Sequence, residues 1–392
     1  MAGVGELEAE SGGNPWLDAA ACTACGPRPS NEDQHLLLHD WNTGGAVGLY
    51  AVFDGHGGPA VPILASKALG PRLSAALEVE INGVASWSTC EGRVEAVKLA
   101  LREIDQQVKS KTVAMDSGST VIAAAIWPVE GEADESTSEF CVLLTNLGDS
   151  RGIVVRGTDA NVLGETIDHK PDDAAEMQRI TTAGGVVSGL KAGECPRVDA
   201  DLAMSRSLGD FRLKDNKDLP PEQQKVSDVP DVFEFCCHSG DIIVLGCDGV
   251  FDVLTSCDVA SMVCQEPQRD PAAMAQNLVA EALRRNNQDN VSCVVIQLRE
   301  NYKPVVTSKT TSGVRRASIG ACDMVRQLSE APGLRPSEEE WQGPFEKLLE
   351  RFPEAGSARV AQAMRDSAGH GGKAAKILRS FQALHPVEQR GP

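Results

Sequence analysis

The first 300 residues alternate between short apolar segments of strand length and longer amphipathic segments. The short segments are rich in Val, Ile and Leu and are bounded by Gly, Asp or Asn, which is typical of buried β-strands. They comprise residues 46–53, 120–126, 140–147, 153–155, 241–246 and 292–298. The longer segments carry apolar residues at helical spacing and predict helices at 94–108, 172–182 and 270–285. The pattern therefore predicts a mixed α and β body.

A different pattern begins at about residue 301. The sequence to residue 337 is rich in Thr, Ser, Lys, Pro and Gly and loses its regular periodicity, which predicts a flexible linker. Beyond it, apolar residues recur at helical spacing in three short segments, around Leu348, Val360 and Leu378. We therefore expect an N-terminal segment at 1–19, a main domain at 20–300, the linker at 301–337, and a small three-helix module at 338–392.

Composition and charge narrow the class of protein. The 392 residues are 42% hydrophobic and 24% charged, which is typical of a globular protein with a large core. No apolar run reaches the roughly 18 residues of a membrane helix, and the N-terminus is acidic, so we expect no membrane segment or secretory signal. Residues 1–300 carry 23 Lys and Arg against 46 Asp and Glu. An acidic body repels DNA and RNA, so we expect no nucleic-acid partner.

The cysteines favour a reducing compartment. The 12 cysteines are scattered and several lie within apolar runs, which is typical of reduced core thiols rather than of a disulfide framework. Cys22 and Cys25 have zinc-like spacing, but no matching pair or nearby histidine accompanies them, so zinc or redox use is not favoured. We expect the protein to be cytoplasmic, nuclear or both.

Acidic residues stand where the predicted strands end. Asp54, Asp149 and Asp248 each follow a buried strand and have glycine beside them, and Asp289 immediately precedes the strand at 292–298. One isolated Asp-Gly pair is usually a turn. Four aspartates in phase with strand ends indicate a site. If the last strand is antiparallel to the others, its start lies beside their ends, and the four carboxylates converge at one edge.

Such a cluster needs a cation, because closely packed carboxylates repel one another or take up protons. We expect oxygen donors with one histidine, His56, and no cysteine at these strand ends, which favours Mg²⁺ or Mn²⁺ over zinc. Two such ions sharing a carboxylate can activate a water and hold a phosphoryl oxygen for phosphoester hydrolysis.

Eight sequence blocks carry a family resemblance, and they cover about residues 20–300. They are Arg28-Pro29-Ser30-Asn31-Glu32-Asp33, Asp54-Gly55-His56-Gly57-Gly58, Ser117-Gly118-Ser119-Thr120, Asn146-Leu147-Gly148-Asp149-Ser150-Arg151, Asp168-His169-Lys170-Pro171, the run 202–210, the run 247–252, and Gln288-Asp289-Asn290-Val291-Ser292. In this order they resemble the PPM (type 2C) metal-dependent Ser/Thr protein phosphatases. The resemblance implies an α+β fold, in which a central antiparallel β-sandwich is flanked by helices.

The same resemblance implies roles for the metal-binding residues. Asp54 would bridge two Mg²⁺ or Mn²⁺ ions, the Gly55 carbonyl would bind one of them, and Asp248 and Asp289 would bind the other. Two further acids, Glu32 and Asp33, would hold metal-bound waters. A third, weaker ion would lie between Asp149 and Asp248, with Asp252 nearby.

It also implies roles for two residues outside the metal shell. Arg28 would grip the substrate phosphate with its planar guanidinium group, and His56 would protonate the leaving serine or threonine oxygen. Without the surrounding blocks, Arg28 would be interpreted as a surface residue and His56 as part of a loop. In the family, Ser117-Gly118-Ser119 is a structural turn, and we interpret it so here. Asp168, Arg206 and Asp210 are assigned to loop support.

Three functions stay open at this point. The first is hydrolysis of phosphoserine and phosphothreonine in proteins by an active enzyme. The second is a pseudophosphatase that keeps the fold and only binds, although no metal position is lost. The third is hydrolysis of small phosphorylated molecules on the same scaffold, which the sequence does not exclude. We expect phosphoprotein substrates and a monomer.

The C-terminal module has a weaker resemblance. Phe352-Pro353, Val360, Met364 and Ile377-Leu378 are similar in spacing to CUE/UBA-type ubiquitin-binding helices. This resemblance implies weak ubiquitin binding through residues 338–392. A plain helical cap or a dimerisation element fits the same short pattern equally well.

Overall fold

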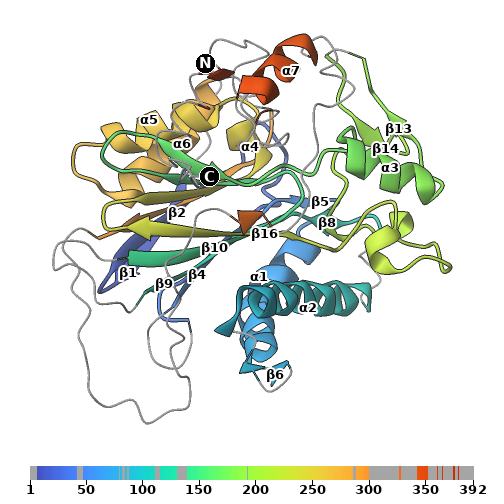
Figure 1. Cartoon of the computed structure of the whole chain (residues 1–392), viewed down its shortest axis with the longest axis horizontal. Coiled ribbons are helices and arrows are strands. Elements are labelled where there is room, and N and C mark those ends of the chain that lie inside the picture. Colours follow the sequence, from blue (N-terminus) through green and yellow to red (C-terminus); the bar gives the residue numbers. More distant parts are fainter. Residues whose placement is uncertain are drawn as a thin grey trace, which may run out of the picture.

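The computed structural model describes most of the chain up to residue 299 and a few segments beyond it. The described residues are 7–41, 47–78, 80–81, 84–85, 88–110, 115–129, 139–191, 193–285, 288–299, 326–327 and 342–351, together with 360, 364, 374, 375 and 378. Two antiparallel sheets form the centre, and helices lie on both outer sides (Figure 1). This arrangement confirms the expected sandwich.

The first sheet, called sheet A, has six strands in the order β1-β2-β18-β17-β11-β12, and every neighbouring pair is antiparallel. Its strands are β1 (Glu8–Asn14), β2 (Leu17–Ala24), β18 (Val291–Leu298), β17 (Ile242–Gly246), β11 (Arg151–Val155) and β12 (Val162–Glu165). Edge strand β1 is exposed along its length except at Asn14.

The second sheet, called sheet B, has the strand order β19-β16-β10-β9-β4-β3 and is also antiparallel throughout. Its strands are β19 (Arg326–Gln327), β16 (Asp231–His238), β10 (Glu139–Leu147), β9 (Val121–Pro128), β4 (Gly48–Phe53) and β3 (Gln34–Leu38). Three smaller sheets consist of β15 (Leu208–Gly209), β8 (Gly118–Ser119) and β5 (Gly55–His56), of β13 (Val187–Ser188) and β14 (Arg197–Val198), and of β6 (Glu80–Ile81) and β7 (Val84–Ala85).

Helices cover the outer faces of both sheets. Helices α1 (Ala60–Leu77) and α2 (Cys90–Lys109) share an apolar core with sheet B, whereas α5 (Ser256–Gln265) and α6 (Pro271–Arg284) pack on sheet A. Figure 1 shows these pairs on opposite sides of the sheets. The described residues also include the short helix α4 (Asp248–Phe251), α3 (Ala174–Thr182), α7 (Gln342–Arg351), and the 3₁₀ turns η3 (Phe211–Leu213) and η4 (Pro221–Gln223).

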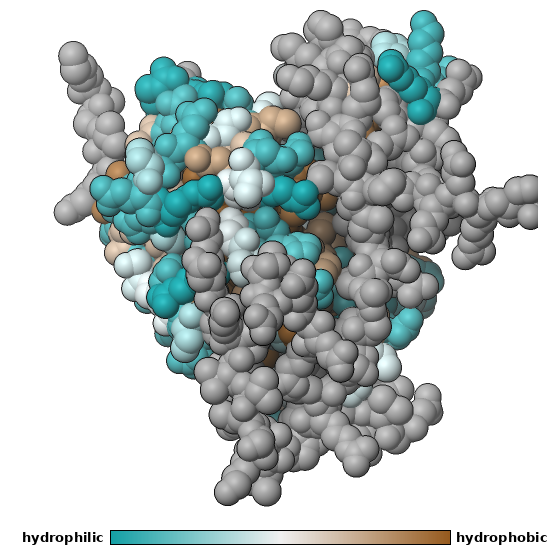
Figure 2. Space-filling model, turned by 60° about the vertical axis from the view of Figure 1, so that its left-hand side comes forward, coloured by the Kyte–Doolittle hydropathy of each residue, from teal (hydrophilic) through white to brown (hydrophobic). Residues whose placement is uncertain are grey.

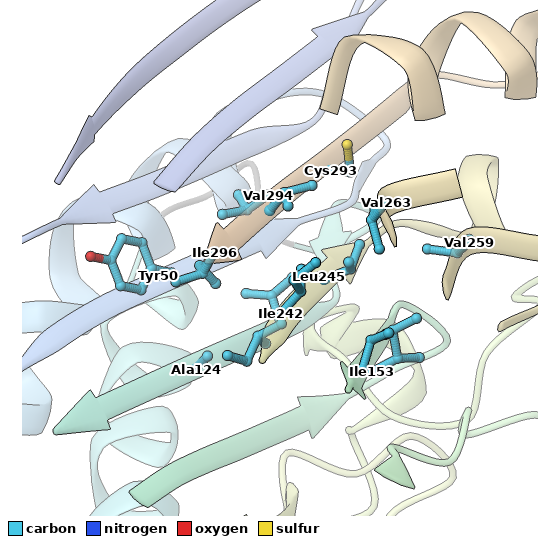
Figure 3. Close-up of a cluster of buried hydrophobic side chains, with 14 of the residues drawn as sticks. Tyr50, Ala124, Ile153, Ile242, Leu245, Val259, Val263, Cys293, Val294 and Ile296 are labelled. Carbon is cyan, nitrogen blue, oxygen red and sulfur yellow. The ribbon is translucent and has the colours of Figure 1, made fainter. Parts of the chain in front are cut away.

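Strand β4 shows why the central strands are apolar without interruption. Tyr50 and Val52 belong to the core between the two sheets, whereas Leu49, Ala51 and Phe53 belong to the core beneath α1 and α2. Successive side chains of a strand point to opposite faces, so a sheet covered on both faces needs apolar residues at every position. Figure 3 shows part of the core around sheet A, where Tyr50 and Ala124 of sheet B lie near strands β17 and β18.

The predicted strands and helices are confirmed with small shifts of their ends. The helix predicted at 270–285 is α6, and the side chain of Asp270 caps it by accepting a hydrogen bond from the Ala272 backbone N–H at 3.1 Å. The sequence pattern did not predict β1, β2, β3, β16, α1 or α5. Within the described part of the chain, no helix is long and apolar enough to cross a membrane.

The C-terminal region is described only in part. Arg326 and Gln327, inside the predicted linker, pair with Glu234 and Phe233 of β16, so at this point the segment is attached to the edge of sheet B. Leu348 of α7 is buried, and so are the helical residues Val360, Met364, Ala374, Ala375 and Leu378. The predicted Phe352-Pro353 turn, Ile377 and the rest of the linker lie outside the described residues. The three-helix module therefore stays a prediction.

The visible surface agrees with the charged composition. On the face shown in Figure 2, the described surface is mainly hydrophilic, and hydrophobic residues show only in scattered patches.

A buried ionic cluster holds α3 to the body. Glu176 of α3 is 3% exposed and accepts hydrogen bonds from Arg179 and Arg206, each at 2.7 Å, and from the Ser205 hydroxyl. Arg206 also reaches Asp231 at 2.9 Å, which is the first residue of β16. Burial alone would raise the pKa of Glu176, but Arg206 and Arg179 outweigh it and hold this pKa well below its usual range. The charged form of Glu176 therefore stabilises the fold.

We predict that Glu176→Gln lowers the free energy of unfolding by about 3 kcal/mol at neutral pH, because it leaves buried guanidinium groups under-compensated. The native stabilisation is present above the usual glutamate pKa of about 4.3 and is lost as the pH falls through the lower folded-state value. Urea unfolding of the native protein and of Glu176→Gln at a series of pH values measures this difference in free energy. Glu281→Gln is the control, because Glu281 pairs with Arg284 and Arg285 at the exposed end of α6 and should contribute little. Equal unfolding midpoints for native protein and Glu176→Gln would contradict the prediction.

Candidate metal centre

The strand topology brings the predicted aspartates to one end of the sandwich. Strands β4 and β10 both pair antiparallel with β9, which lies between them, so they run in the same direction and end at the same edge of sheet B. Asp54 directly follows β4, and Asp149 lies two residues beyond β10. Two carboxylates from distant parts of the sequence therefore share this edge.

Sheet A supplies the other two aspartates. Strand β17 ends at Gly246 and leads into Asp248, the first residue of α4. Strand β18 pairs antiparallel with β17, so Asp289 and Asn290, just before β18, lie at that same end. The antiparallel arrangement expected for the last strand is thus confirmed. One carboxylate oxygen each from Asp54 and Asp248 lie within 4.8 Å of one another.

Burial and mutual repulsion both disfavour the charged forms of this cluster. Burial, together with the neighbouring charges of Asp248, Asp33 and Asp149, raises the pKa of Asp54 well above its usual range. Burial, with the charges of Asp149 and Asp252, likewise raises the pKa of Asp248 well above normal. Without a cation, burial and neighbouring charges both disfavour the charged forms of these two carboxylates. The donor set therefore fits a site for divalent cations.

Asp33 supplies an independent sign that a ligand belongs here. The residue is 4% exposed, and neither of its carboxylate oxygens has a hydrogen bond of normal geometry among the described residues, although Ser292, Cys247 and the Gly55 backbone lie close enough to favour its charged form. Burial raises the pKa of this carboxyl group to about 6, and the charge of Asp289 contributes to the increase. Buried oxygens without well-formed hydrogen bonds are costly, so a bound ion with its waters would supply the missing contacts.

The expectation that no cysteine stands at these strand ends was wrong. Cys247 follows β17, and its sulfur lies within 4.8 Å of carboxylate oxygens of Asp54 and Asp248. The sulfur accepts a hydrogen bond from the Ser292 N–H at 3.1 Å and donates to the Asn290 carbonyl at 3.7 Å. Burial and the neighbouring aspartates raise the pKa of Cys247 well above normal. A neutral, hydrogen-bonded thiol is a poor ligand, so oxygen donors still define the site.

Glu32 and Gly55 approach each other closely. A side chain at Gly55 would place its Cβ 2.4 Å from the Glu32 carbonyl oxygen, so glycine is required here. The Glu32 carboxylate accepts a hydrogen bond of 2.8 Å from the Gly58 N–H. The two predicted metal-binding residues are thus brought together by contact between two loops.

Asp149 has a basic partner that the sequence analysis did not assign. The Lys170 ammonium donates a hydrogen bond to one Asp149 carboxylate oxygen, while the other oxygen has no partner among the described residues. Burial alone would lower the pKa of Lys170, but Asp149, Asp252 and Asp168 outweigh it and raise this pKa. Lys170 is therefore a fixed positive charge at the predicted third metal position.

Arg28 lies at the rim of the site. Its guanidinium group is half exposed and contacts the Asp289 carboxylate at 2.7 Å and the Gln288 carbonyl at 3.0 Å. Asn290, which the sequence analysis also left without a role, donates to the carbonyls of Cys25 and Ser30 at 2.8 and 3.0 Å. It thereby fixes the loop that carries Arg28 to the start of β18. The Asp-Asn pair before β18 is the sequence signal for this role.

His56 lies in β5, two residues after Asp54, and its ring contacts a carboxylate. Its Nε2 lies 2.8 Å from the carboxylate of Asp210, whereas its Nδ1 is buried and has no partner among the described residues. Burial alone would lower the pKa of His56, but Asp210, Asp149 and Glu32 raise it above its usual value. Of the predicted acids, Asp54 and Asp248 belong to the group of possible ligand atoms that lie within 4.8 Å of one another among the described residues, whereas Glu32, Asp33, Asp149 and Asp289 do not belong to that group.

Comparisons with known proteins agree with this geometry. The family model described as Protein phosphatase 2C matches residues 17–291. "Probable protein phosphatase 2C 44" of Oryza sativa subsp. japonica is 30% identical over 270 residues, which cover 68% of this chain and 74% of the relative. "Probable protein phosphatase 2C 17" of Arabidopsis thaliana is 30% identical over 272 residues, which cover 69% and 84%.

A solved structure shows the same fold. The crystal structure of a phosphatase from Toxoplasma gondii is similar with a TM-score of 0.63 and 26% identity, covering 75% of this chain and 96% of that chain. The family match ends before the C-terminal tail, so the resemblance to CUE/UBA modules stays a prediction. The chain belongs to the protein phosphatase 2C family, whose members are metal-dependent protein serine/threonine phosphatases.

Proposed function

We propose that this chain hydrolyses phosphoserine and phosphothreonine in proteins with two Mg²⁺ or Mn²⁺ ions at the end of the sandwich. The observation that carries the proposal is the approach of the Asp54 and Asp248 carboxylates to within 4.8 Å of one another, beside the buried carboxylate of Asp33. Hard divalent cations prefer oxygen ligands, and this cluster supplies them from both sheets. When bound, a pair of such ions supplies a nucleophilic water and neutralises phosphate charge.

The ligands are proposed from the resemblance and from their position. Asp54 and the Gly55 carbonyl would hold the ions on the side of sheet B, and Asp248 and Asp289 on the side of sheet A. Glu32 and Asp33 would hold coordinated waters, because both lie on the loop before β3. Asp149 would contribute to a third ion together with Asp248, where Lys170 already supplies one positive charge.

Two side chains would act on the substrate itself. Arg28 is half exposed at the rim, where its guanidinium group can hold two phosphate oxygens. The ring of His56 keeps Nδ1 free of any described partner, so this nitrogen is available to donate a proton to the leaving oxygen. This division of roles separates phosphate binding from bond cleavage.

The alternatives receive less support. A pseudophosphatase would be expected to lack a metal-binding side chain, whereas every predicted carboxylate is present in the sequence. A small-molecule phosphohydrolase would use the same ions and is distinguished only by its substrate. We also propose that the enzyme is a monomer of the cytoplasm, the nucleus or both, on the basis of the reduced cysteines and the hydrophilic surface.

We predict that hydrolysis of a phosphothreonine peptide requires Mg²⁺ or Mn²⁺. Excess EDTA should abolish phosphate release, and either ion, added back beyond the chelator, should restore it. A parallel assay with a sugar phosphate and a nucleotide tests the small-molecule alternative. Full activity in EDTA would refute the metal-dependent mechanism, and preference for the small molecules would refute the assignment of protein substrates.

We predict that Asp54→Asn lowers turnover more than about 100-fold and weakens Mn²⁺ binding in calorimetry, because it removes the proposed bridging carboxylate. Asp18→Asn is the matched control, since Asp18 pairs with Arg299 at the surface. It should leave both measurements unchanged. Normal Mn²⁺ affinity in Asp54→Asn would contradict the proposed ligand set.

Arg28→Ala should raise KM for the phosphopeptide about tenfold with a smaller effect on kcat, as expected when about 1.4 kcal/mol of phosphate binding is lost. Steady-state kinetics measure both constants. A fall in kcat at constant KM would show that Arg28 does not bind the phosphate.

We propose that residues 338–392 form a separate helical module that binds ubiquitin weakly. Helix α7 and the buried helical residues Val360, Met364 and Leu378 support the helical part of this proposal. A chain cut after Thr311 should keep its kcat, because every proposed ligand precedes β18.

Titration of labelled ubiquitin with the full chain and the cut chain should show chemical-shift changes only with the full chain. A folded but inactive cut chain would refute the separation, and no shift with the full chain would refute ubiquitin binding.

A further inference from the structure

A small three-stranded sheet beside the metal centre holds His56 against a carboxylate. Its strand order is β15-β8-β5, so β8 lies between the other two. His56 of β5 is the register partner of Gly118, and Gly209 of β15 is the register partner of Gly118 on the other side. The next residue, Asp210, places its carboxylate 2.8 Å from the His56 Nε2. The contact therefore joins the two outer strands across the middle one.

Gly118 makes this contact sterically possible. A Cβ at this position would lie 2.2 Å from an Asp210 carboxylate oxygen and 2.7 Å from the His56 Nε2. Any side chain would thus occupy the space in which the ring and the carboxylate meet. The turn at Ser117–Ser119 therefore does more than enter a strand, because its glycine admits the histidine–aspartate pair.

Asp210 is itself held in place by its surroundings. Its carboxylate accepts a hydrogen bond from the Ser207 hydroxyl, and its N–H donates to the Ser117 carbonyl at 3.0 Å. Its φ of 54° lies in the left-handed region, which aspartate tolerates better than most residues. The preceding Gly209 N–H donates to Asp105 of α2 at 2.7 Å. The carboxylate thus has a fixed position next to the imidazole.

We propose that Asp210 is a positioning residue for His56. The carboxylate accepts a hydrogen bond from Nε2–H, which fixes the orientation of the ring and leaves Nδ1 as the other proton-bearing nitrogen. Nδ1 is then the atom that gives its proton to the leaving serine or threonine oxygen as the phosphorus–oxygen bond breaks. The buried Nδ1 without a described partner agrees with this assignment. The proposal rests on the proposed phosphatase function.

The test compares two substrates that differ in their need for a proton. The alkoxides of serine and threonine are poor leaving groups and must be protonated as they leave, whereas p-nitrophenolate leaves without a proton. Asp210→Asn should lower kcat for a phosphothreonine peptide at least about tenfold and change kcat for p-nitrophenyl phosphate less than about twofold. Asparagine keeps the size and tolerates the left-handed φ, so the substitution changes mainly the hydrogen bond to the ring.

A double variant separates positioning from a general structural role. If Asp210 acts through the imidazole, Asp210→Asn should cause no further loss when it is added to His56→Gln. Gly118→Ala serves as a second, independent variant. Its methyl group would push the His56 ring and the Asp210 carboxylate apart, although neither of these two residues is itself replaced. It should show the same difference between the two substrates. Urea unfolding of each variant reports whether the fold is retained.

The outcomes distinguish this proposal from the function on which it rests. A native enzyme that does not hydrolyse the phosphopeptide would refute the phosphatase assignment itself. If the native enzyme is active, and Asp210→Asn and Gly118→Ala each lower kcat equally for both substrates, only the positioning role is overturned. Additional loss from Asp210→Asn in the His56→Gln background would overturn it too.

Discussion

The close packing of carboxylates, which are partly removed from water and repel one another, is the constraint on which the rest of this structure depends. Asp33, Asp54, Asp149 and Asp248 lie at one end of the sandwich, and burial and mutual charge raise the pKa of Asp54 and Asp248. Such an arrangement survives only if the surrounding scaffold is rigid enough to hold it. Asp54, Asp149 and Asp248 follow β4, β10 and β17, which are central strands with almost entirely buried residues, whereas Asp33 precedes the edge strand β3. Three of the four unfavourable charges therefore lie at the ends of the best-buried strands.

Much of the fold could be predicted because its central strands are covered on both sides. Largely apolar strands such as β4 and β10, in which nearly every residue is buried, are typical of strands covered on both faces. The missed elements have weaker signals. Strand β2 is rich in alanine, which has little preference for strands, and α1 contains Pro71 in its interior and apolar residues around most of its circumference. In both cases tertiary packing outweighs local preference.

The carboxylates of the site could be predicted because each marks the end of a strand. Their partners could not, because those contacts join residues far apart along the chain. The His56–Asp210 contact spans 154 residues, and the contact between Arg28 and Asp289 spans 261. Cys247 is a different case, because its position between β17 and Asp248 is visible in the sequence. Its chemistry depends on burial and on the Ser292 N–H, neither of which is visible in the sequence alone.

Strand β1, at one edge of sheet A, affects how readily the protein aggregates at high concentration. An edge strand presents unpaired backbone groups to which the edge of a second molecule can add, and this is a common route to aggregation. Strand β1 is such an edge, and its exposed positions include Glu8 and Glu10. Two copies approaching through this edge would bring these glutamates toward the same residues of the other copy. The acidic strand thus opposes edge-to-edge assembly of the sandwich at high concentration.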